Sequence, residues 1–244
     1  MRLRSIIALR RCTGAALMGL ALLASSCTAP MGDYRDAARG PDERLLELVE
    51  CYGVERDARA TRMKEGGAPL QTGLIRNELR RLHLEYPTHA ATLFTLATLT
   101  YEEGGPERAA AYLDDLFAVQ PAHPEGGVLR SRIAISEGNL PAARRVLEQQ
   151  IRYTPDHAGL REALGSTAYM AGELDEARRE LEMARRLGAP TWRVAYNLGL
   201  IEEASGNQTL AMERYEVAIA ENPDFHPATS RLMGLRALFG DVVR

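Results

Sequence analysis

The chain has 244 residues, of which 45% are hydrophobic and 26% charged, an ordinary globular composition that excludes wholesale disorder. Its 30 basic residues include a single lysine, Lys64, within an Arg-Met-Lys-Glu-Gly segment. A phosphate-binding loop ending in Gly-Lys-Ser/Thr is therefore excluded. Alanine, leucine, arginine and glutamate dominate, and aromatic residues make up only 6%, so the composition favours helices over sheets.

Residues 1–26 have the pattern of an export signal. Four arginines and no acidic residue occur in this segment, and an apolar run covers residues 14–23. That run is much shorter than the ~20 residues that a membrane-spanning helix needs. A basic start, a short apolar stretch and small residues before Cys27 therefore predict a signal peptide that is removed, rather than a permanent anchor helix.

The end of this signal, Leu23-Ala24-Ser25-Ser26-Cys27, resembles the lipobox of bacterial lipoproteins. In that family the cysteine is acylated and becomes the first residue of the mature protein. The resemblance implies a lipid anchor on Cys27, and the following Thr28 favours the outer membrane, facing the periplasm. The alternative is an ordinary secretory signal in which Cys27 carries no lipid.

The charge balance changes when the signal is removed. The mature chain keeps 26 basic and 33 acidic residues, a formal charge of −7, because the signal contains four arginines and no acidic residue. An acidic protein is a poor candidate for binding nucleic acid, so no nucleic-acid partner is expected.

The segment between the signal and the repeats divides into two parts. Residues 27–41 contain two prolines and two glycines and are expected to form a flexible tether. Residues 42–89 are expected to hold N-terminal capping helices and a degenerate repeat. Asp42 is placed to cap a first helix, and residues 70–86 have the apolar spacing of a second helix that Pro87 ends.

A 34-residue repeat occupies most of the remaining chain. The same spacing relates three series of residues: Gly104, Gly138, Gly172 and Gly206; Ala109, Ala143, Ala177 and Ala211; and Leu113, Leu147, Leu181 and Tyr215. Each copy predicts a hairpin of two helices joined at the glycine. Neither helix of such a hairpin can bury its apolar face alone, so the hairpins must stack on one another.

Spacing and residue types together resemble the tetratricopeptide repeat. The best copy contains Tyr196-Asn197-Leu198-Gly199, Ala211, Tyr215, Ala218 and Pro223, whereas Gln150 replaces a small residue in the second copy. The resemblance implies an all-α fold, an α-solenoid of stacked antiparallel helix hairpins in a right-handed superhelix. The expected divisions are repeats over 90–123, 124–157, 158–191 and 192–225, and a C-terminal capping helix within 226–244.

Three histidines, His89, His123 and His157, are also 34 residues apart. Equivalent points on stacked hairpins are ~8–10 Å apart. The ligands of one zinc ion lie only ~2.1 Å from the metal, so no metal site is expected within one molecule. We expect these histidines in the polar turns that enter the first helices, with Thr88 and Asp156 as helix caps. A metal that bridges two molecules is the alternative.

No catalytic motif is present in the sequence. It lacks a Gly-x-Ser-x-Gly elbow, a His-Glu-x-x-His motif and a nucleotide-binding glycine loop. The acidic pairs Glu102-Glu103, Asp114-Asp115 and Glu202-Glu203 are interpreted as solvated helix faces. We therefore expect no catalytic residue, no cofactor and no enzyme activity.

In the tetratricopeptide family, the first helices of successive repeats line a concave groove that holds a peptide or helix of another protein. Residues four apart on a helix share a face, so the groove can be projected onto this chain. The projected groove residues are Phe94, Thr98, Tyr101, Val128, Arg132, Ile135, Glu162, Ser166, Tyr169, Arg193, Tyr196 and Leu200. Their mixture of apolar groups and isolated charges suits an amphipathic segment. The alternative is that some of them pack against the neighbouring hairpin.

These features predict a non-enzymatic scaffold in the bacterial envelope, tethered to the membrane by its lipid anchor. Its partners are expected to be other envelope proteins or peptides, held in the groove during assembly of a complex such as a secretin, pilus or secretion machine. The alternative is an accessory subunit that positions a cell-wall hydrolase or synthase. A direct enzyme is the third hypothesis, and it lacks a catalytic group.

Overall fold

The computed structural model describes residues 39–50, 52 and 72–240. The predicted signal peptide, Cys27 and most of the predicted tether lie outside this range. The chain divides into two compact units, residues 1–85 and residues 86–244, which are taken separately below. Among the described residues, no helix has both the length and the apolar character needed to cross a membrane.

The described part of the first unit consists of two helices, residues 41–50 and α3 (Thr72–Glu85). Both contribute buried apolar side chains, namely Leu45, Leu48, Ile75, Leu79 and Leu82. An ion pair between Arg44 and Glu85 joins the two helices. The hydrogen bond from Arg44 holds the pKa of the Glu85 carboxyl below its usual value.

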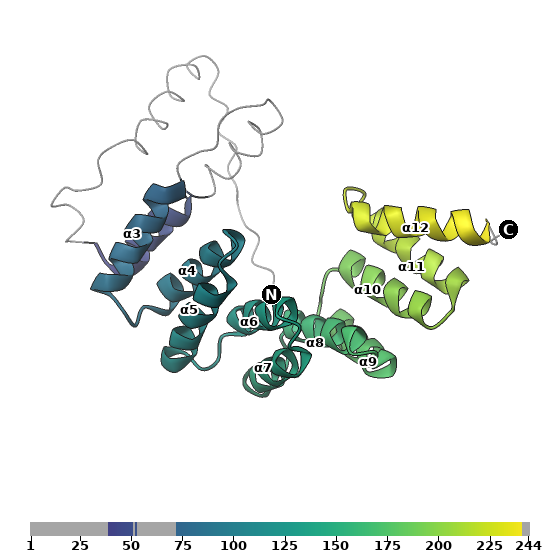
Figure 1. Cartoon of the computed structure of the whole chain (residues 1–244), viewed down its shortest axis with the longest axis horizontal. Coiled ribbons are helices and arrows are strands. Elements are labelled where there is room, and N and C mark those ends of the chain that lie inside the picture. Colours follow the sequence, from purple (N-terminus) through teal and green to yellow (C-terminus); the bar gives the residue numbers. More distant parts are fainter. Residues whose placement is uncertain (1–38, 51, 53–71, 241–244) are drawn as a thin grey trace, which may run out of the picture. The chain divides into compact units, whose positions relative to one another are not determined.

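The described part of the second unit consists of helices without strands (Figure 1). They are α4 (Ala90–Glu102), α5 (Pro106–Val119), α6 (Pro124–Ser136), α7 (Leu140–Tyr153), α8 (Ala158–Met170), α9 (Leu174–Arg186), α10 (Thr191–Ala204), α11 (Gln208–Glu221) and α12 (His226–Phe239). Each of the four 34-residue segments thus contributes two helices, and α12 follows them.

Contacts between these helices follow the order of the chain. α4 packs with α5, α6 with α7, α8 with α9, and α10 with α11, which gives four hairpins (Figure 1). Each hairpin contacts the next, and α12 packs on α11. The first helices also meet, since α6 contacts α8 and α8 contacts α10. The prediction of an all-α solenoid of stacked hairpins is confirmed.

The 34-spaced glycines end the first helices of the hairpins. Gly104, Gly138, Gly172 and Gly206 all have φ between 73° and 81°, a region that side chains with a Cβ disfavour. At the first of them, the Gly104 amide donates to the Tyr101 carbonyl at 3.0 Å and the Gly105 amide donates to the Thr100 carbonyl at 2.9 Å. These bonds satisfy the last carbonyls of the helix and turn the chain into the second helix.

The connection from α9 to α10 differs from the other links between hairpins. It uses a glycine turn, in which Gly188 has φ 92° and the Ala189 amide donates to the Ala184 carbonyl at 2.9 Å. Pro190 then precedes α10 as its N-cap residue.

Small residues allow the two helices of a hairpin to approach closely. A Cβ atom on Gly199 would lie 2.5 Å from Cε1 of the fully buried Tyr215. A Cβ atom on Gly165 would lie 2.9 Å from Cγ of Leu181. Glycine on the first helix therefore leaves room for a large side chain on the second, as the repeat pattern predicts.

The prediction that Glu202 and Glu203 form a solvated face is wrong. Glu202 is fully buried, forms an ion pair with Arg178 of α9, and accepts a hydrogen bond from Asn207 at 2.9 Å. Burial raises the pKa of Glu202, but the hydrogen bonds from Arg178 and Asn207 outweigh burial and hold the pKa below its usual value. The pair thus ties the third hairpin to the fourth.

Glu203 likewise has partners on other helices. It accepts hydrogen bonds from the Tyr215 hydroxyl at 2.7 Å and from Arg231 of α12 at 3.1 Å. Burial, together with the hydrogen bond to Glu203, raises the pKa of Tyr215 well above its usual value. The fourth hairpin is thereby linked to the closing helix.

Candidate functional site

The three 34-spaced histidines are themselves the N-cap residues of α4, α6 and α8, so the assignment of these caps to Thr88 and Asp156 is wrong. Nδ1 of His123 accepts from the Gly126 amide at 3.0 Å, and Nδ1 of His157 accepts from the Leu160 amide at 3.3 Å. Nδ1 of His89 instead lies 2.7 Å from the Thr92 hydroxyl. Within the described ranges, no group of three His, Cys, Asp or Glu side chains is placed to hold a metal ion.

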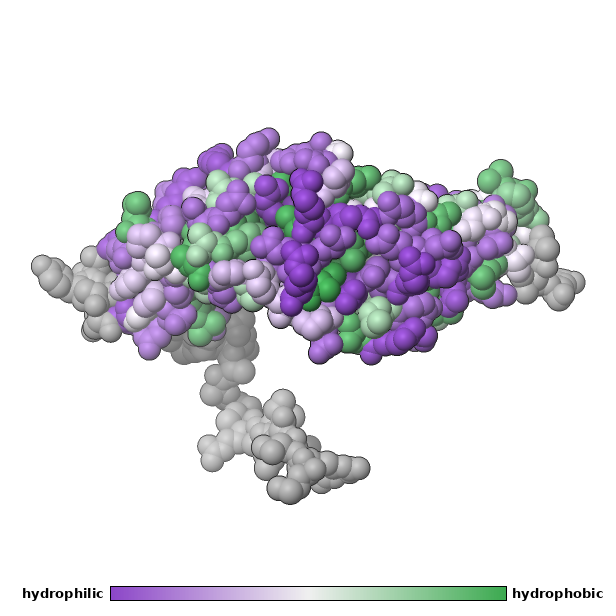
Figure 2. Space-filling model, turned by 90° about the horizontal axis from the view of Figure 1, so that it is seen from below, coloured by the Kyte–Doolittle hydropathy of each residue, from purple (hydrophilic) through white to green (hydrophobic). Residues whose placement is uncertain are grey.

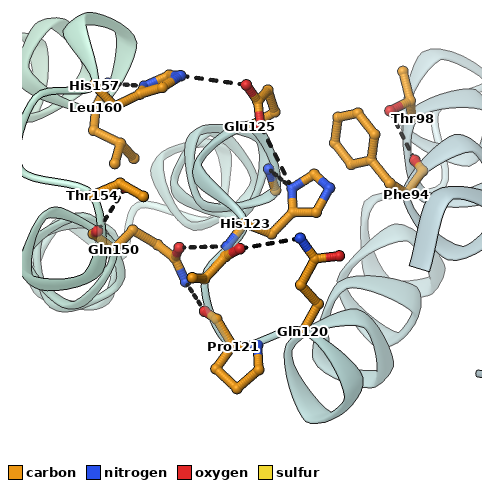
Figure 3. Close-up of polar contacts among 12 residues, drawn as sticks. Phe94, Thr98, Gln120, Pro121, His123, Glu125, Gln150, Thr154, His157 and Leu160 are labelled. Carbon is orange, nitrogen blue, oxygen red and sulfur yellow. Dashed lines mark hydrogen bonds and ion pairs between the residues drawn. The ribbon is translucent and has the colours of Figure 1, made fainter.

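A buried glutamine positions the start of α6 (Figure 3). Gln150, on α7, donates to the Pro121 carbonyl at 2.8 Å and accepts from the His123 amide at 2.9 Å. A Cβ atom on Gly127 would lie 2.5 Å from Cγ of Gln150. The larger residue at position 150 therefore fits because position 127 has no side chain.

His123 also connects this junction to α4. Its ring centroid lies 4.7 Å from that of Phe94, with the ring planes tilted by 41°, and Figure 3 shows the two rings beside each other. On the other side, Glu125 extends toward His157, whose Nε2 lies 3.3 Å from the Glu125 carboxylate (Figure 3). The histidines at the starts of α6 and α8 thus each contact a side chain of a neighbouring first helix.

A hollow of about 530 Å³ opens beside these groups, and we call it the groove. It is lined by side chains from four first helices, α4, α6, α8 and α10. The lining residues are Phe94, Thr98, Glu125, Val128, Leu129, Ser131, Arg132, Ile135, His157, Gly159, Glu162, Ala163, Ser166, Met170 and Arg193. A second hollow, of about 140 Å³, shares Ser166 and Met170 with the groove.

Ten of the twelve projected residues line one of these hollows. Eight line the groove, namely Phe94, Thr98, Val128, Arg132, Ile135, Glu162, Ser166 and Arg193. Tyr169 and Leu200 line the smaller hollow. Their roles in binding remain predictions, but the structure brings their side chains together.

Two projected residues lie elsewhere. Tyr101 packs against the apolar cluster of the first two hairpins, and Tyr196 packs against the clusters of the last hairpin and α12. The Tyr196 ring lies 5.0 Å from that of Phe225 in an edge-on arrangement and 5.8 Å from that of Tyr215. These two tyrosines agree with the alternative expectation that some of the projected residues pack against neighbouring elements.

The projection missed several residues that line the groove. Met170 lies four residues after Ser166, and Glu125 lies three residues before Val128, so both continue rows that already contain projected residues. Helical spacing alone could have found them. His157 lies in a turn before α8, where no helical row predicts its direction.

Most polar groups of the groove already have partners. Arg193 donates to Glu162 at 2.7 Å, across α10 and α8. The hydroxyls of Thr98 and Ser166 donate to carbonyls of their own helices, those of Phe94 and Glu162. These hydroxyls remain able to accept a hydrogen bond from another molecule.

The surface seen from below Figure 1 has a different character. Figure 2 shows hydrophilic residues over most of this face, with apolar residues in small separate patches. The described residues in this view therefore form no broad apolar surface, whereas the groove places Phe94, Val128, Ile135 and Met170 together.

A family model described as the tetratricopeptide repeat matches residues 134–198. Among curated proteins, the chain is 30% identical over 91 residues to a probable biofilm formation methyltransferase, WspC, of Pseudomonas putida. That match covers 37% of this chain and 21% of the relative, so the chain spans about a fifth of that protein.

Solved structures extend the similarity over more of the chain. The tetratricopeptide protein TTC0263 of Thermus thermophilus gives a TM-score of 0.63 at 21% identity and covers 81% of this chain and all of that one. PilW, described as a type IV pilus biogenesis factor, gives 0.58 at 20% identity, covering 62% of this chain and 70% of that one. YrrB, described as a tetratricopeptide protein with an unusual peptide-binding site, gives 0.51 at 16%, covering 66% and 82%. The repeat pattern, the helix contacts and these similarities agree: the second unit folds as a solenoid of tetratricopeptide-type helix hairpins.

Proposed function

We propose that this protein is a non-enzymatic scaffold that holds another protein or peptide in the groove. The observation that carries the proposal is a hollow of about 530 Å³ lined by side chains of four successive first helices. A bound partner would cover the apolar side chains of the groove and remove them from water. The charged groups around these side chains would fix the orientation of the partner. The peptide-binding site named for the fold neighbour YrrB supports this mode.

We extend the proposal to the place of action, on the basis of the sequence. A lipid on Cys27 would hold the protein in the bacterial envelope, at the outer membrane and facing the periplasm. The groove would then hold envelope proteins during assembly of a pilus, secretin or secretion machine. The fold similarity to PilW, described as a pilus biogenesis factor, supports this role.

Crosslinking in intact cells tests the scaffold proposal. A photoreactive amino acid is placed at Ile135, which lines the groove, and in a second strain at Gln149, which is exposed on α7 outside it. We expect a discrete crosslinked product from position 135 and none of that mass from position 149. Equal products from both positions, or none from position 135, would contradict binding in the groove. A cell-wall hydrolase or synthase as the crosslinked partner would replace the assembly role with the accessory role.

Metabolic labelling with a fatty-acid analogue tests the anchor separately. We expect label on the wild-type protein and none on Cys27→Ala. Equal label on both proteins, or no label on the wild type, would rule out acylation at this residue.

A further inference from the structure

The charged side chains that line the groove differ in whether they have a partner. Arg193 and Glu162 neutralise each other, and Glu125 lies against His157. Arg132, on α6, forms no hydrogen bond or ion pair with any residue in the described ranges, although it is exposed and lines the groove. Among the described residues of the groove, Arg132 therefore presents a guanidinium that has no carboxylate partner.

The surroundings of Arg132 limit what that molecule can be. Val128 and Ile135 flank it on the same face of α6, and Phe94 contributes an aromatic ring from α4. A free inorganic anion would pair with the guanidinium but would leave these apolar side chains exposed to water. A polypeptide can satisfy both, because a carboxylate and apolar side chains occur together along one segment.

Arginine is well suited to this pairing. Its planar guanidinium can donate two parallel hydrogen bonds to one carboxylate, which fixes direction as well as charge. We infer that the groove binds a polypeptide segment in which an Asp or Glu carboxylate pairs with Arg132 while neighbouring apolar side chains fill the hollow beside Phe94, Val128 and Ile135. This inference rests on the proposed function and names the chemistry of its partner.

Selection of peptides by charge tests the inference. A displayed library of random linear peptides is panned against the full-length wild type in detergent, and in parallel against Arg132→Glu and Arg145→Glu. Arg145 is the matched control, because it is an exposed arginine on α7 that is outside the groove. We expect the wild type and Arg145→Glu to select peptides with an acidic residue beside apolar ones. Arg132→Glu should select a basic residue at that place.

Affinity measurements on one selected peptide then give the contribution of the pairing with Arg132 to binding. Replacing its acidic residue by the matching amide should weaken binding to the wild type about fivefold, the upper range for an exposed ion pair. The same replacement should leave binding to Arg132→Gln unchanged. Circular dichroism spectra of the variants should match that of the wild type, since the altered side chains are exposed.

Two failures can be told apart. Selected peptides whose binding is lost in Ile135→Asp, but which show no acidic preference, would overturn the pairing with Arg132 and leave the scaffold proposal standing. Selected peptides whose binding is unaffected by Ile135→Asp would overturn both, because they would bind outside the groove.

Discussion

Glu202 shows how a single buried side chain can stabilise the contact between two neighbouring repeats. A buried carboxylate is costly unless charged and polar partners surround it, and this one has both Arg178 and Asn207. Arg178 belongs to the preceding hairpin, so the ion pair forms only when the two hairpins are stacked.

We expect Arg178→Ala to lower the free energy of unfolding by about 2 kcal/mol. This value lies below the range for fully buried pairs, because the Arg178 side chain is 39% exposed. The neighbouring Arg179→Ala is the control and should change the free energy by less than about 0.5 kcal/mol, since Arg179 is exposed and forms no hydrogen bond or ion pair with a described residue. Urea titrations measure both, and equal effects would contradict a special role of the ion pair.

The same pair predicts a pH dependence. The pKa of Glu202 in the folded protein is lower than its usual value of 4.5, so the unfolded chain takes up the proton first as the pH falls. The stabilisation is therefore complete above pH 4.5 and is lost as the pH falls through the lowered folded-state pKa. In Arg178→Ala, Glu202 stays buried but loses the ion pair that stabilises its charge. Protonation of Glu202 removes this penalty, so the difference in stability between wild type and variant should become smaller as the pH falls. A difference that stays constant from neutral pH to pH 3 would contradict this account.

At the scale of the helix, the register of the repeat could be predicted from the sequence because it depends on local rules. A glycine with positive φ follows each first helix, and a small residue on one helix faces a large residue on the other. These requirements recur at the same positions of each repeat, so the residues appear at a regular spacing in the sequence. The exact residue that caps a helix depends on backbone angles over one or two positions, which spacing does not resolve. For that reason residue type alone favours Thr88 and Asp156 over the histidines that follow them.

The cap of α8 can be tested with adjacent residues. We expect His157→Ala to lower the free energy of unfolding by about 1 kcal/mol, because the Leu160 amide loses its acceptor. Asp156→Ala should have little effect, since Asp156 is exposed and is not the N-cap residue. Thermal unfolding of the two variants decides between them, and the reverse ranking would restore Asp156 as the cap.

The groove could be predicted in part for similar reasons. Helical spacing groups Phe94, Arg132 and Glu162, and their side chains line the same hollow, because residues on one face keep their direction along a helix. Tyr101 and Tyr196 share that face, but their large rings reach the apolar clusters of neighbouring elements. Whether a side chain at the edge of a face turns toward a groove or a neighbour depends on packing across repeats, which one helix does not determine.

For the molecule as a whole, stability should depend on contacts between neighbouring repeats. α12 closes the last hairpin, because its Leu232 and Leu235 are buried with Met212 and Tyr215 of α11. A stacked array without such a closing helix would expose the apolar face of its last hairpin to water.

Removal of residues 226–244 should therefore affect the repeats unequally. We expect faster amide hydrogen exchange in α10 and α11, because each buried leucine contributes about 1.5–3 kcal/mol. Exchange in α4 and α5 should change much less, since α12 packs on α11 at the other end of the stack. Met233→Ala is the control, because Met233 is 66% exposed on the outer side of α12. Equal acceleration across all four hairpins would contradict stability by neighbour contacts.

The fit between Gln150 and Gly127 also constrains the evolutionary history of this junction. An alanine at position 127 would overlap the glutamine side chain, which two hydrogen bonds hold in place. A side chain at position 127 therefore requires a smaller residue at position 150, and glutamine at position 150 requires glycine at position 127. We expect substitutions at these two sites to be correlated among descendants of this chain.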